Sequence, residues 1–162
     1  MFKQPITRLF FAGLAGLAGL SAAGPRAHAG PGDFTFPASS CSPLVGYQVE
    51  YDNQGVHSVG SSGAWVLCAD GVVKRRYKGF TASVTDRSTT ESVICAFWGK
   101  NKDTPTYGPQ TAFSGANFTG DFYLFAGLFP NVESTLMAVQ CWLPAPSAQG
   151  ASYLHSVFID VH

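Results

Sequence analysis

Short runs of alternating apolar and polar residues dominate the chain after its first forty positions. In residues 44–51 the larger side chains share one face: Val45, Tyr47, Val49 and Tyr51. A period of two is typical of a half-buried strand, because successive side chains along a strand point to opposite faces. Turn-like segments rich in Gly, Asp, Asn, Ser and Pro separate these runs. No long segment shows the 3.6-residue period of a helix.

The same pattern predicts further strands at 56–59, 64–69, 72–77, 80–85, 92–98, 135–143 and 152–161. Between two of these runs stands Asp70-Gly71, which predicts a hairpin because both residues tolerate the positive φ angles of a type I′ turn. Residues 99–109 are expected to form a loop. Residues 122–129 are apolar on both faces, which fits either a central strand or a short buried helix. About eight short strands at near-regular spacing predict an all-β fold, either an antiparallel β-sandwich or a Greek-key barrel.

The first 29 residues have the three parts of a secretory signal peptide. Two cations precede the apolar run at 9–24, and Ala27-His28-Ala29 supplies the small residues of a cleavage site. This apolar run has 16 residues, fewer than the ~20 that span a bilayer. We therefore expect cleavage after Ala29, a flexible N-terminal arm over 30–40 and a single β domain over 41–162. The mature chain is expected to be secreted or periplasmic, without a stable membrane span.

Removal of the signal peptide changes the charge of the chain. Three cations leave with it and no acid does, so the mature part has seven basic and ten acidic residues, a net charge of −3. A weakly acidic domain does not attract phosphate backbones. We therefore expect no nucleic-acid partner.

All four cysteines, Cys41, Cys68, Cys95 and Cys141, lie in the predicted mature domain. An even number of cysteines in an exported chain predicts two disulfides. Zinc sites usually bring cysteines in close pairs, whereas 26, 26 and 45 residues separate these four. Three pairings are possible. We favour Cys41–Cys68 and Cys95–Cys141, because sequential strands are often neighbours.

Three short motifs connect the chain to a group of small exported bacterial proteins. The segment 139–144 (VQCWLP), with the closing strand at 152–160, resembles the end of these proteins. They also carry V-x-C strands earlier, as residues 66–68 (VLC) and 93–95 (VIC) do here. The group is uncharacterised, so the resemblance implies export and a β fold and implies no activity.

Catalytic and metal-binding motifs are absent from the sequence. The predicted mature chain has three histidines, His57, His155 and His162, and each is expected to be a surface or strand-edge residue. There is no G-x-S-x-G nucleophile elbow, H-E-x-x-H motif or EF-hand loop. A calcium site at acidic turns, such as Asp52 or Asp70, remains an alternative. We expect no cofactor and favour a protein that is not an enzyme.

Each tryptophan lies in a cysteine-containing strand at an odd offset from the cysteine. In an unbroken strand an odd offset means opposite faces. If the cysteines face the core, the tryptophans face outward and form a binding surface: Trp65, Trp98 and Trp142. The alternative is that the tryptophans fill the core, or that a bulge reverses the parity.

The first functional hypothesis is therefore an exported, non-enzymatic β-sandwich that binds a glycan or a protein partner. One alternative is a small secreted hydrolase whose catalytic residues meet only in the fold. Another is a structural component of the cell envelope or surface.

Overall fold

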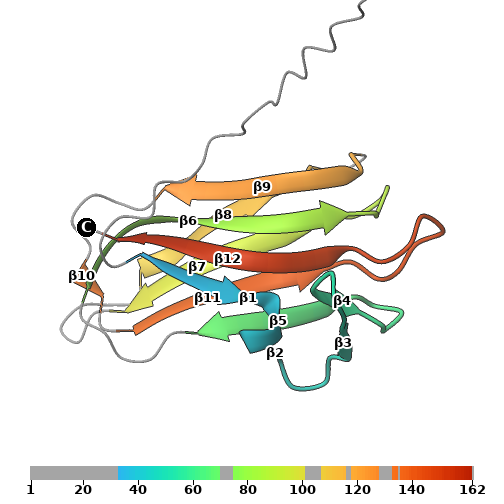
Figure 1. Cartoon of the computed structure of the whole chain (residues 1–162), viewed down its shortest axis with the longest axis horizontal. Coiled ribbons are helices and arrows are strands. Elements are labelled where there is room, and N and C mark those ends of the chain that lie inside the picture. Colours follow the sequence, from blue (N-terminus) through green and yellow to red (C-terminus); the bar gives the residue numbers. More distant parts are fainter. Residues whose placement is uncertain are drawn as a thin grey trace, which may run out of the picture.

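The computed structural model describes residues 33–69, 75–100, 107–115, 118–127, 133–134 and 136–161. Over these ranges the chain forms twelve β-strands and one short 3-10 helix, arranged as two antiparallel sheets that face each other (Figure 1). The predicted all-β antiparallel sandwich is confirmed. The predicted signal peptide and Asp70-Gly71 lie outside the described residues.

The larger sheet has seven strands with β6 and β12 at its centre. Beside β6 lie β9 and β10, while β12 pairs on its other edge with β1 and β4, and β3 follows β4. Its strands are β1 (Phe34–Pro37), β3 (Val49–Tyr51), β4 (Val56–Ser58), β6 (Arg75–Asp86), β9 (Gly120–Gly127), β10 (Glu133–Ser134) and β12 (Tyr153–Val161).

The smaller sheet has five strands in the order β2-β5-β11-β7-β8. They are β2 (Ser42–Pro43), β5 (Ala64–Ala69), β7 (Ile94–Lys100), β8 (Tyr107–Phe113) and β11 (Leu136–Leu143). The long strands of both sheets, among them β6, β9, β11 and β12, run roughly along the long axis of the molecule (Figure 1).

The hydrophobic core lies between the two sheets and follows the alternation of the strands. Large inward side chains come from both sheets and are fully buried: Phe80, Val84, Leu154, Ile159, Val66, Met137, Val139 and Leu143. Burial of each such side chain contributes about 1.5–3 kcal/mol to the stability of the fold.

Two disulfides cross-link the smaller sheet, one between β7 and β11 and one between β5 and Cys41, the residue just before β2. They link Cys41 to Cys68 and Cys95 to Cys141, so the favoured pairing is confirmed. Cys95 in β7 stands directly opposite Cys141 in β11. All four cysteines are buried on the core side of the sheet. Each bond therefore fixes a strand pair within one sheet.

The strand expected over 44–51 is shorter than predicted, and the first part of this prediction is wrong. Only Val49–Tyr51 forms a strand, β3. Val45 is exposed in a turn, and Gly46 has a φ of 90°, which interrupts an extended backbone. The following turn at 52–55 is present.

The predicted hairpin between residues 64–69 and the following strand is also wrong. These strands, β5 and β6, belong to different sheets. Both edges of β5 pair with other strands, β2 and β11, so β6 pairs elsewhere. An Asp-Gly pair favours a chain reversal, but the pairing of the flanking strands depends on the edges that the fold leaves open.

Three further expectations differ from the structure. Residues 34–40 form β1 and the 3-10 helix η1 (Ala38–Ser40), and not a flexible arm, because Phe36 packs against the core and Ala38 is buried. The loop predicted over 99–109 overlaps two strands, because β7 extends to Lys100 and β8 begins at Tyr107. The described part of the apolar segment, residues 122–127, lies in an edge strand, β9, whose outer aromatic residues are exposed.

Candidate functional site

The three tryptophans lie on the outer face of the five-stranded sheet. Trp65 of β5 stands directly opposite Trp142 of β11, and Trp98 of β7 stands opposite Ala138 of β11. The cysteines of the same strands are buried on the core side, so the parity argument gives the correct face. Each indole is half-buried. That these residues bind a ligand remains a prediction.

Two of the tryptophans form a packed aromatic cluster with a nearby tyrosine. The ring centroids of Trp65 and Trp142 are 5.5 Å apart, and Tyr47 meets Trp142 edge-on with 6.2 Å between the centroids. The Trp142 indole N–H lies 3.4 Å from Glu91 Oε2. Gly63 lies beneath the indole, where an added Cβ would be 2.5 Å from the Trp142 ring. The indole of Trp142 is therefore held in place from several sides.

The inner strands of this outer face are mostly apolar, whereas the flanking strands β2 and β8 add Ser42 and Thr111. Strand register places one amide, Gln140, among apolar neighbours on β5, β7 and β11: Leu67, Ile94, Ala96 and Ala138. The outer face of an antiparallel sandwich is normally polar. We call this surface, from Trp65 through Gln140 to Trp98, the tryptophan face. The indole nitrogen of Trp98 is buried and has no hydrogen-bond partner among the residues that the structure describes.

The outer face of the seven-stranded sheet is polar along its central strand β6, whereas the edge strand β9 adds the exposed rings of Tyr123 and Phe125. Residues with hydroxyl groups occupy the outward positions of β6, among them Thr81, Ser83 and Thr85. At one end of this sheet lies a pocket of about 410 Å³. It is lined by Gln54, Ser83, Thr85, Arg87, Asp121, Phe122, Tyr123 and His155. We call this the His155 pocket.

A chain of hydrogen bonds crosses the wall of the His155 pocket. The Thr85 hydroxyl donates to Asp121 Oδ1 at 2.5 Å and lies 2.8 Å from His155 Nε2. The other ring nitrogen of His155 contacts the backbone carbonyl of Gln54. His155 itself stands where the register of β12 shifts between Leu154 and Ser156, and bulges of this kind re-aim side chains.

The turn at 52–55 supports this wall of the pocket. Asp52 Oδ1 accepts hydrogen bonds from the backbone N–H groups of Gln54 at 2.7 Å and Gly55 at 3.1 Å. The Gln54 bond is the main cause that holds the pKa of Asp52 below its usual value. An added Cβ at Gly55 would be 2.1 Å from the Leu154 carbonyl oxygen. Only glycine lets the turn approach β12 this closely.

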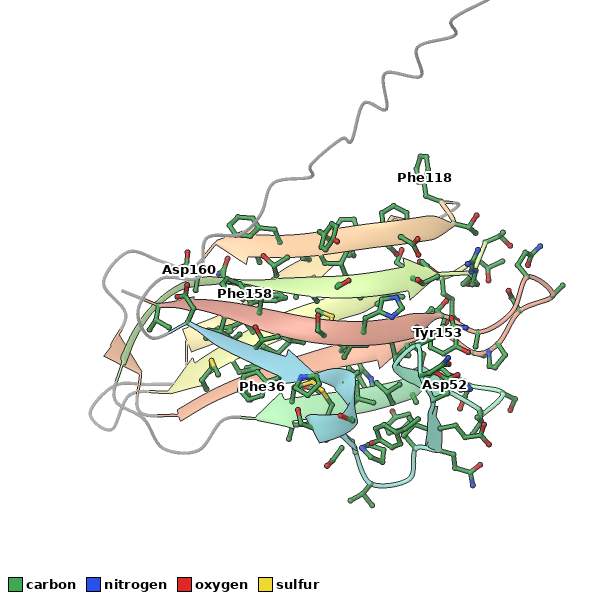
Figure 2. All side chains as sticks on the ribbon, viewed as in Figure 1. Phe36, Asp52, Phe118, Tyr153, Phe158 and Asp160 are labelled. Atoms are coloured by element: carbon green, nitrogen blue, oxygen red, sulfur yellow. A yellow bond between two sulfur atoms is a disulfide. The ribbon has the colours of Figure 1, made fainter. Side chains whose placement is uncertain are left out.

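Tyr153 joins the turn to the sheet. Its hydroxyl donates to Asp52 Oδ2 at 3.2 Å, and Figure 2 shows the two residues together at the end of the molecule where β3 and β4 meet. Desolvation, followed by the bond to Asp52, raises the pKa of Tyr153. Both carboxylate oxygens of Asp52 thus have protein partners, which leaves the suggested calcium site without support at this residue.

The remaining histidines contribute less to a site. His57 lies 3.8 Å from Glu50 Oε2 and 3.9 Å from Asp52 Oδ2, and its buried Nδ1 makes no hydrogen bond. His162 lies outside the described residues. Among the residues that the structure describes, no group of three or more His, Cys, Asp or Glu is placed to hold a metal ion. The described part of the chain also has no helix long and apolar enough to cross a membrane.

Sequence reasoning missed the His155 pocket. It treated His155 as a surface or strand-edge residue, whereas the structure brings it to Thr85 and Asp121. Thr85 is 70 residues from His155 and 36 from Asp121. No local motif marks such a group, and the register shift that re-aims His155 leaves no clear signal in the sequence.

Comparison with known proteins supports the fold. No family model matches the sequence, and no curated protein is similar to it. The structure is similar to a low-affinity xylan-binding module, CBM86, from Roseburia intestinalis, with a TM-score of 0.50 and 12% identity over 80% of this chain and 96% of that one. It is also similar to the GH26-CBM35 β-(1,4)-mannanase of Podospora anserina, with a TM-score of 0.50 and 11% identity over 80% of this chain and 28% of that one. At these identities the likeness establishes a shared β-sandwich fold.

Proposed function

We propose that this chain is a secreted or periplasmic, non-enzymatic module that binds glycans through the tryptophan face. The observation that carries the proposal is the apolar, aromatic character of an outward sheet face that is normally polar. Three tryptophans on the outer face of one sheet are a costly arrangement in water, and exposed apolar surfaces of this kind mark binding sites. The two buried disulfides fit an oxidising compartment outside the cytoplasm.

Sugar rings match the chemistry of the tryptophan face. One side of a pyranose ring presents mostly C–H groups, which pack against flat aromatic rings, while its hydroxyl groups need hydrogen-bonding partners at the edge. Ligand sites combine apolar and aromatic walls with a few polar groups. Here Trp65 and Trp142 supply the aromatic wall, and Gln140 and Glu91 supply the polar groups.

A glycan is favoured over a protein partner by the composition of the face. A protein interface of standard size brings a polar rim with about ten hydrogen bonds, whereas Gln140 is the one polar side chain between the tryptophans of β5, β11 and β7. The structural similarity to a xylan-binding module and to a mannanase makes xylan and mannan the first polysaccharides to test.

The hydrolase alternative rests on the His155 pocket, which brings a histidine to a hydroxyl and an acid. A hydrolase of the Ser-His-Asp type needs a nucleophile whose hydroxyl is exposed and donates to the histidine. Thr85 is only 5% exposed, and its hydroxyl hydrogen is directed to Asp121. The geometry therefore favours binding over acyl transfer.

Affinity electrophoresis in gels containing xylan or mannan tests the proposal. We expect at least one of the two polysaccharides to slow the migration of the protein. The double variant Trp65→Ala/Trp142→Ala should restore free migration. Phe125→Ala, which removes an exposed aromatic residue from the other sheet, is the matched control and should bind like the original protein. Circular dichroism checks that each variant is folded.

Equal retardation of the original protein and the tryptophan double variant would overturn the proposal. So would free migration of the original protein in every polysaccharide of a broad panel. A second measurement does not depend on substitution: bound oligosaccharide should change the tryptophan fluorescence, because it excludes water from the indoles.

A further inference from the structure

The His155 pocket has the features of a second ligand site. It lies on the outer face of the seven-stranded sheet, so the whole sandwich separates it from the tryptophan face. Its volume of about 410 Å³ falls within the range of roughly 300–1,000 Å³ that is typical of small-molecule sites. In Figure 2 the labelled Tyr153 and Phe118 stand at the same end of the molecule, on either side of the ends of β6 and β12.

The wall of this pocket is fixed before any ligand arrives. Thr85 connects Asp121 to His155, and the Gln54 carbonyl holds the far side of the imidazole. The close approach that Gly55 permits keeps the turn against β12. Groups that are held in place in advance lose little conformational entropy when a ligand binds.

The hydrogen bonds of this wall engage both of its titratable groups. Asp121 Oδ1 accepts from the Thr85 hydroxyl. Both ring nitrogens of His155 have partners, the Thr85 hydroxyl and the Gln54 carbonyl.

Arg87 also lines the pocket, and these hydrogen bonds do not involve its side chain. Its backbone is fixed, because its N–H donates to Ser152 and its carbonyl accepts from Ser147. Its guanidinium makes no hydrogen bond or ion pair with the described part of the chain, and the residue is exposed. A free guanidinium presents five donors in a planar fork that matches a carboxylate.

An aromatic ring borders the same pocket. Tyr123 is 80% exposed and stands two residues from Asp121 on the same face of β9. The pocket therefore brings together a flat ring, a carboxylate acceptor and a free guanidinium. A sugar ring with a carboxylate group would use all three: the ring packs on Tyr123, a hydroxyl donates to Asp121, and the carboxylate pairs with Arg87.

We propose that the His155 pocket binds a hexuronic acid unit of an acidic glycan, independently of the tryptophan face. Arg87 pairs with the carboxylate of the sugar, Tyr123 stacks on its ring, and Asp121 accepts a hydrogen bond from a ring hydroxyl. The His155–Thr85 pair holds Asp121 in position and is not itself required to contact the ligand.

Titration of the isotope-labelled protein with methyl β-D-glucuronide, followed by amide NMR spectra, tests this site. The largest shifts are expected in residues 83–87 and 121–123. Methyl β-D-glucoside, which lacks the carboxylate, should bind at least about tenfold more weakly, the loss expected for hydrogen bonds to a charged group. Arg87→Gln should weaken binding of the glucuronide by a similar factor, and Arg87→Lys should weaken it less.

Matched variants separate the site from its surroundings. Tyr123→Ala should weaken glucuronide binding, whereas Phe125→Ala, an exposed residue on the same face of the same strand that does not line the pocket, should leave it unchanged. Equal binding of the glucuronide and the glucoside would overturn the proposal. Shifts confined to the tryptophan face, or an Arg87→Gln variant that binds like the original, would overturn it as well.

The two proposals fail in different ways. If Trp65→Ala/Trp142→Ala abolishes polysaccharide binding while the glucuronide still shifts residues 121–123, both sites are present and independent. If the glucuronide shifts the amide signals of the pocket but no polysaccharide slows the migration of the protein, the proposal for the His155 pocket is supported and the proposal for the tryptophan face is wrong. If a polysaccharide slows the migration of the protein but the glucuronide shifts no amide signal of the pocket, the proposal for the tryptophan face is supported and the proposal for the His155 pocket is wrong.

Discussion

The two outer faces of the sandwich have the same architecture but differ in where their aromatic residues lie: on the inner strands of the five-stranded sheet, and on the edge strand β9 of the seven-stranded sheet. Both consist of antiparallel strands whose inward side chains form one shared core. On the seven-stranded sheet the outward positions of β6 carry hydroxyl groups and border a polar pocket. On the five-stranded sheet the outward positions of β5, β7 and β11 carry indoles and aliphatic groups. Because the inward residues form the core, the outward residues of each sheet can differ without loss of core packing.

The two faces also differ in how they are constructed. Trp65 and Trp142 become neighbours through one strand pair, β5 with β11. The His155 pocket needs a turn, an edge strand, a central strand and a bulge in β12 to meet at one point. A change in one strand therefore alters one side of the tryptophan face, whereas a change in any of several elements alters the pocket.

The largest expected difference between the faces concerns the disulfide beneath the tryptophans. Cys95→Ala/Cys141→Ala opens a loop with a sequence separation of 46, which costs about 4 kcal/mol of unfolding free energy on the chain-entropy model. Chemical denaturation measures this loss. Cys41→Ala/Cys68→Ala, with a separation of 27, should cost slightly less. An unchanged denaturation midpoint for the first variant would show that the bond does not constrain the unfolded chain.

A smaller effect is expected where a glycine supports the tryptophan face. Gly63→Ala places a methyl group against the Trp142 ring at a residue with a φ of 75°, and should destabilise the fold by about 1–3 kcal/mol. It should also weaken polysaccharide binding and leave the His155 pocket unaffected. Gly150→Ala has a similar positive φ of 110° with no atom near the new Cβ, so it measures the backbone strain alone. Equal losses for both variants would mean that Trp142 is not held by this contact.

The smallest effect concerns the turn that supports the pocket. Because the folded-state pKa of Asp52 lies below its ordinary value of 3.8, its ionised form stabilises the turn above that value. This contribution is lost as the pH falls through the folded pKa. Amide NMR signals of Gln54 and Gly55 should therefore change below about pH 4, while those of the tryptophan face stay constant. Asp52→Asn should remove this pH dependence, and a titration that is the same in both proteins would contradict the assignment.

The sequence predicts the general fold and the outward placement of the three tryptophans. Period-two alternation yields most of the strands, and the odd offset from the cysteine of the same strand places Trp65, Trp98 and Trp142 on the correct face. It does not predict which strands pair: Asp70-Gly71 suggests a hairpin, although β5 and β6 lie in different sheets. Pairing depends on which edges remain open once the whole sandwich has formed.

The exposed aromatic residues of β9 show the second limit of sequence reasoning. Phe122–Phe125 is apolar on both faces, a pattern typical of a central strand, yet Tyr123 and Phe125 are exposed at a sheet edge. Apolarity alone cannot distinguish a covered face from a face that meets a ligand. His155 was overlooked for a related reason, because its partners Thr85 and Asp121 meet it only through tertiary structure.

A buried carboxylate joins the two sheets at one end. Asp86, at the end of β6, is fully buried and accepts hydrogen bonds from Ser152 and from the backbone of Ser88. It also accepts from the Val93 N–H and the Ser114 hydroxyl, which border β7 and β8 of the other sheet. Neither disulfide crosses the core in this way, since both cross-link the five-stranded sheet.

This placement of Asp86 has a consequence for the use of the molecule as an engineering scaffold. The five-stranded sheet is cross-linked by covalent bonds, so its outer face can be redesigned extensively while its strand register is retained. At this end Asp86 adds hydrogen bonds between the sheets to the packing of the core. A library of new binding surfaces can therefore vary both outer faces, provided that Asp86 and its four hydrogen-bond donors are kept constant.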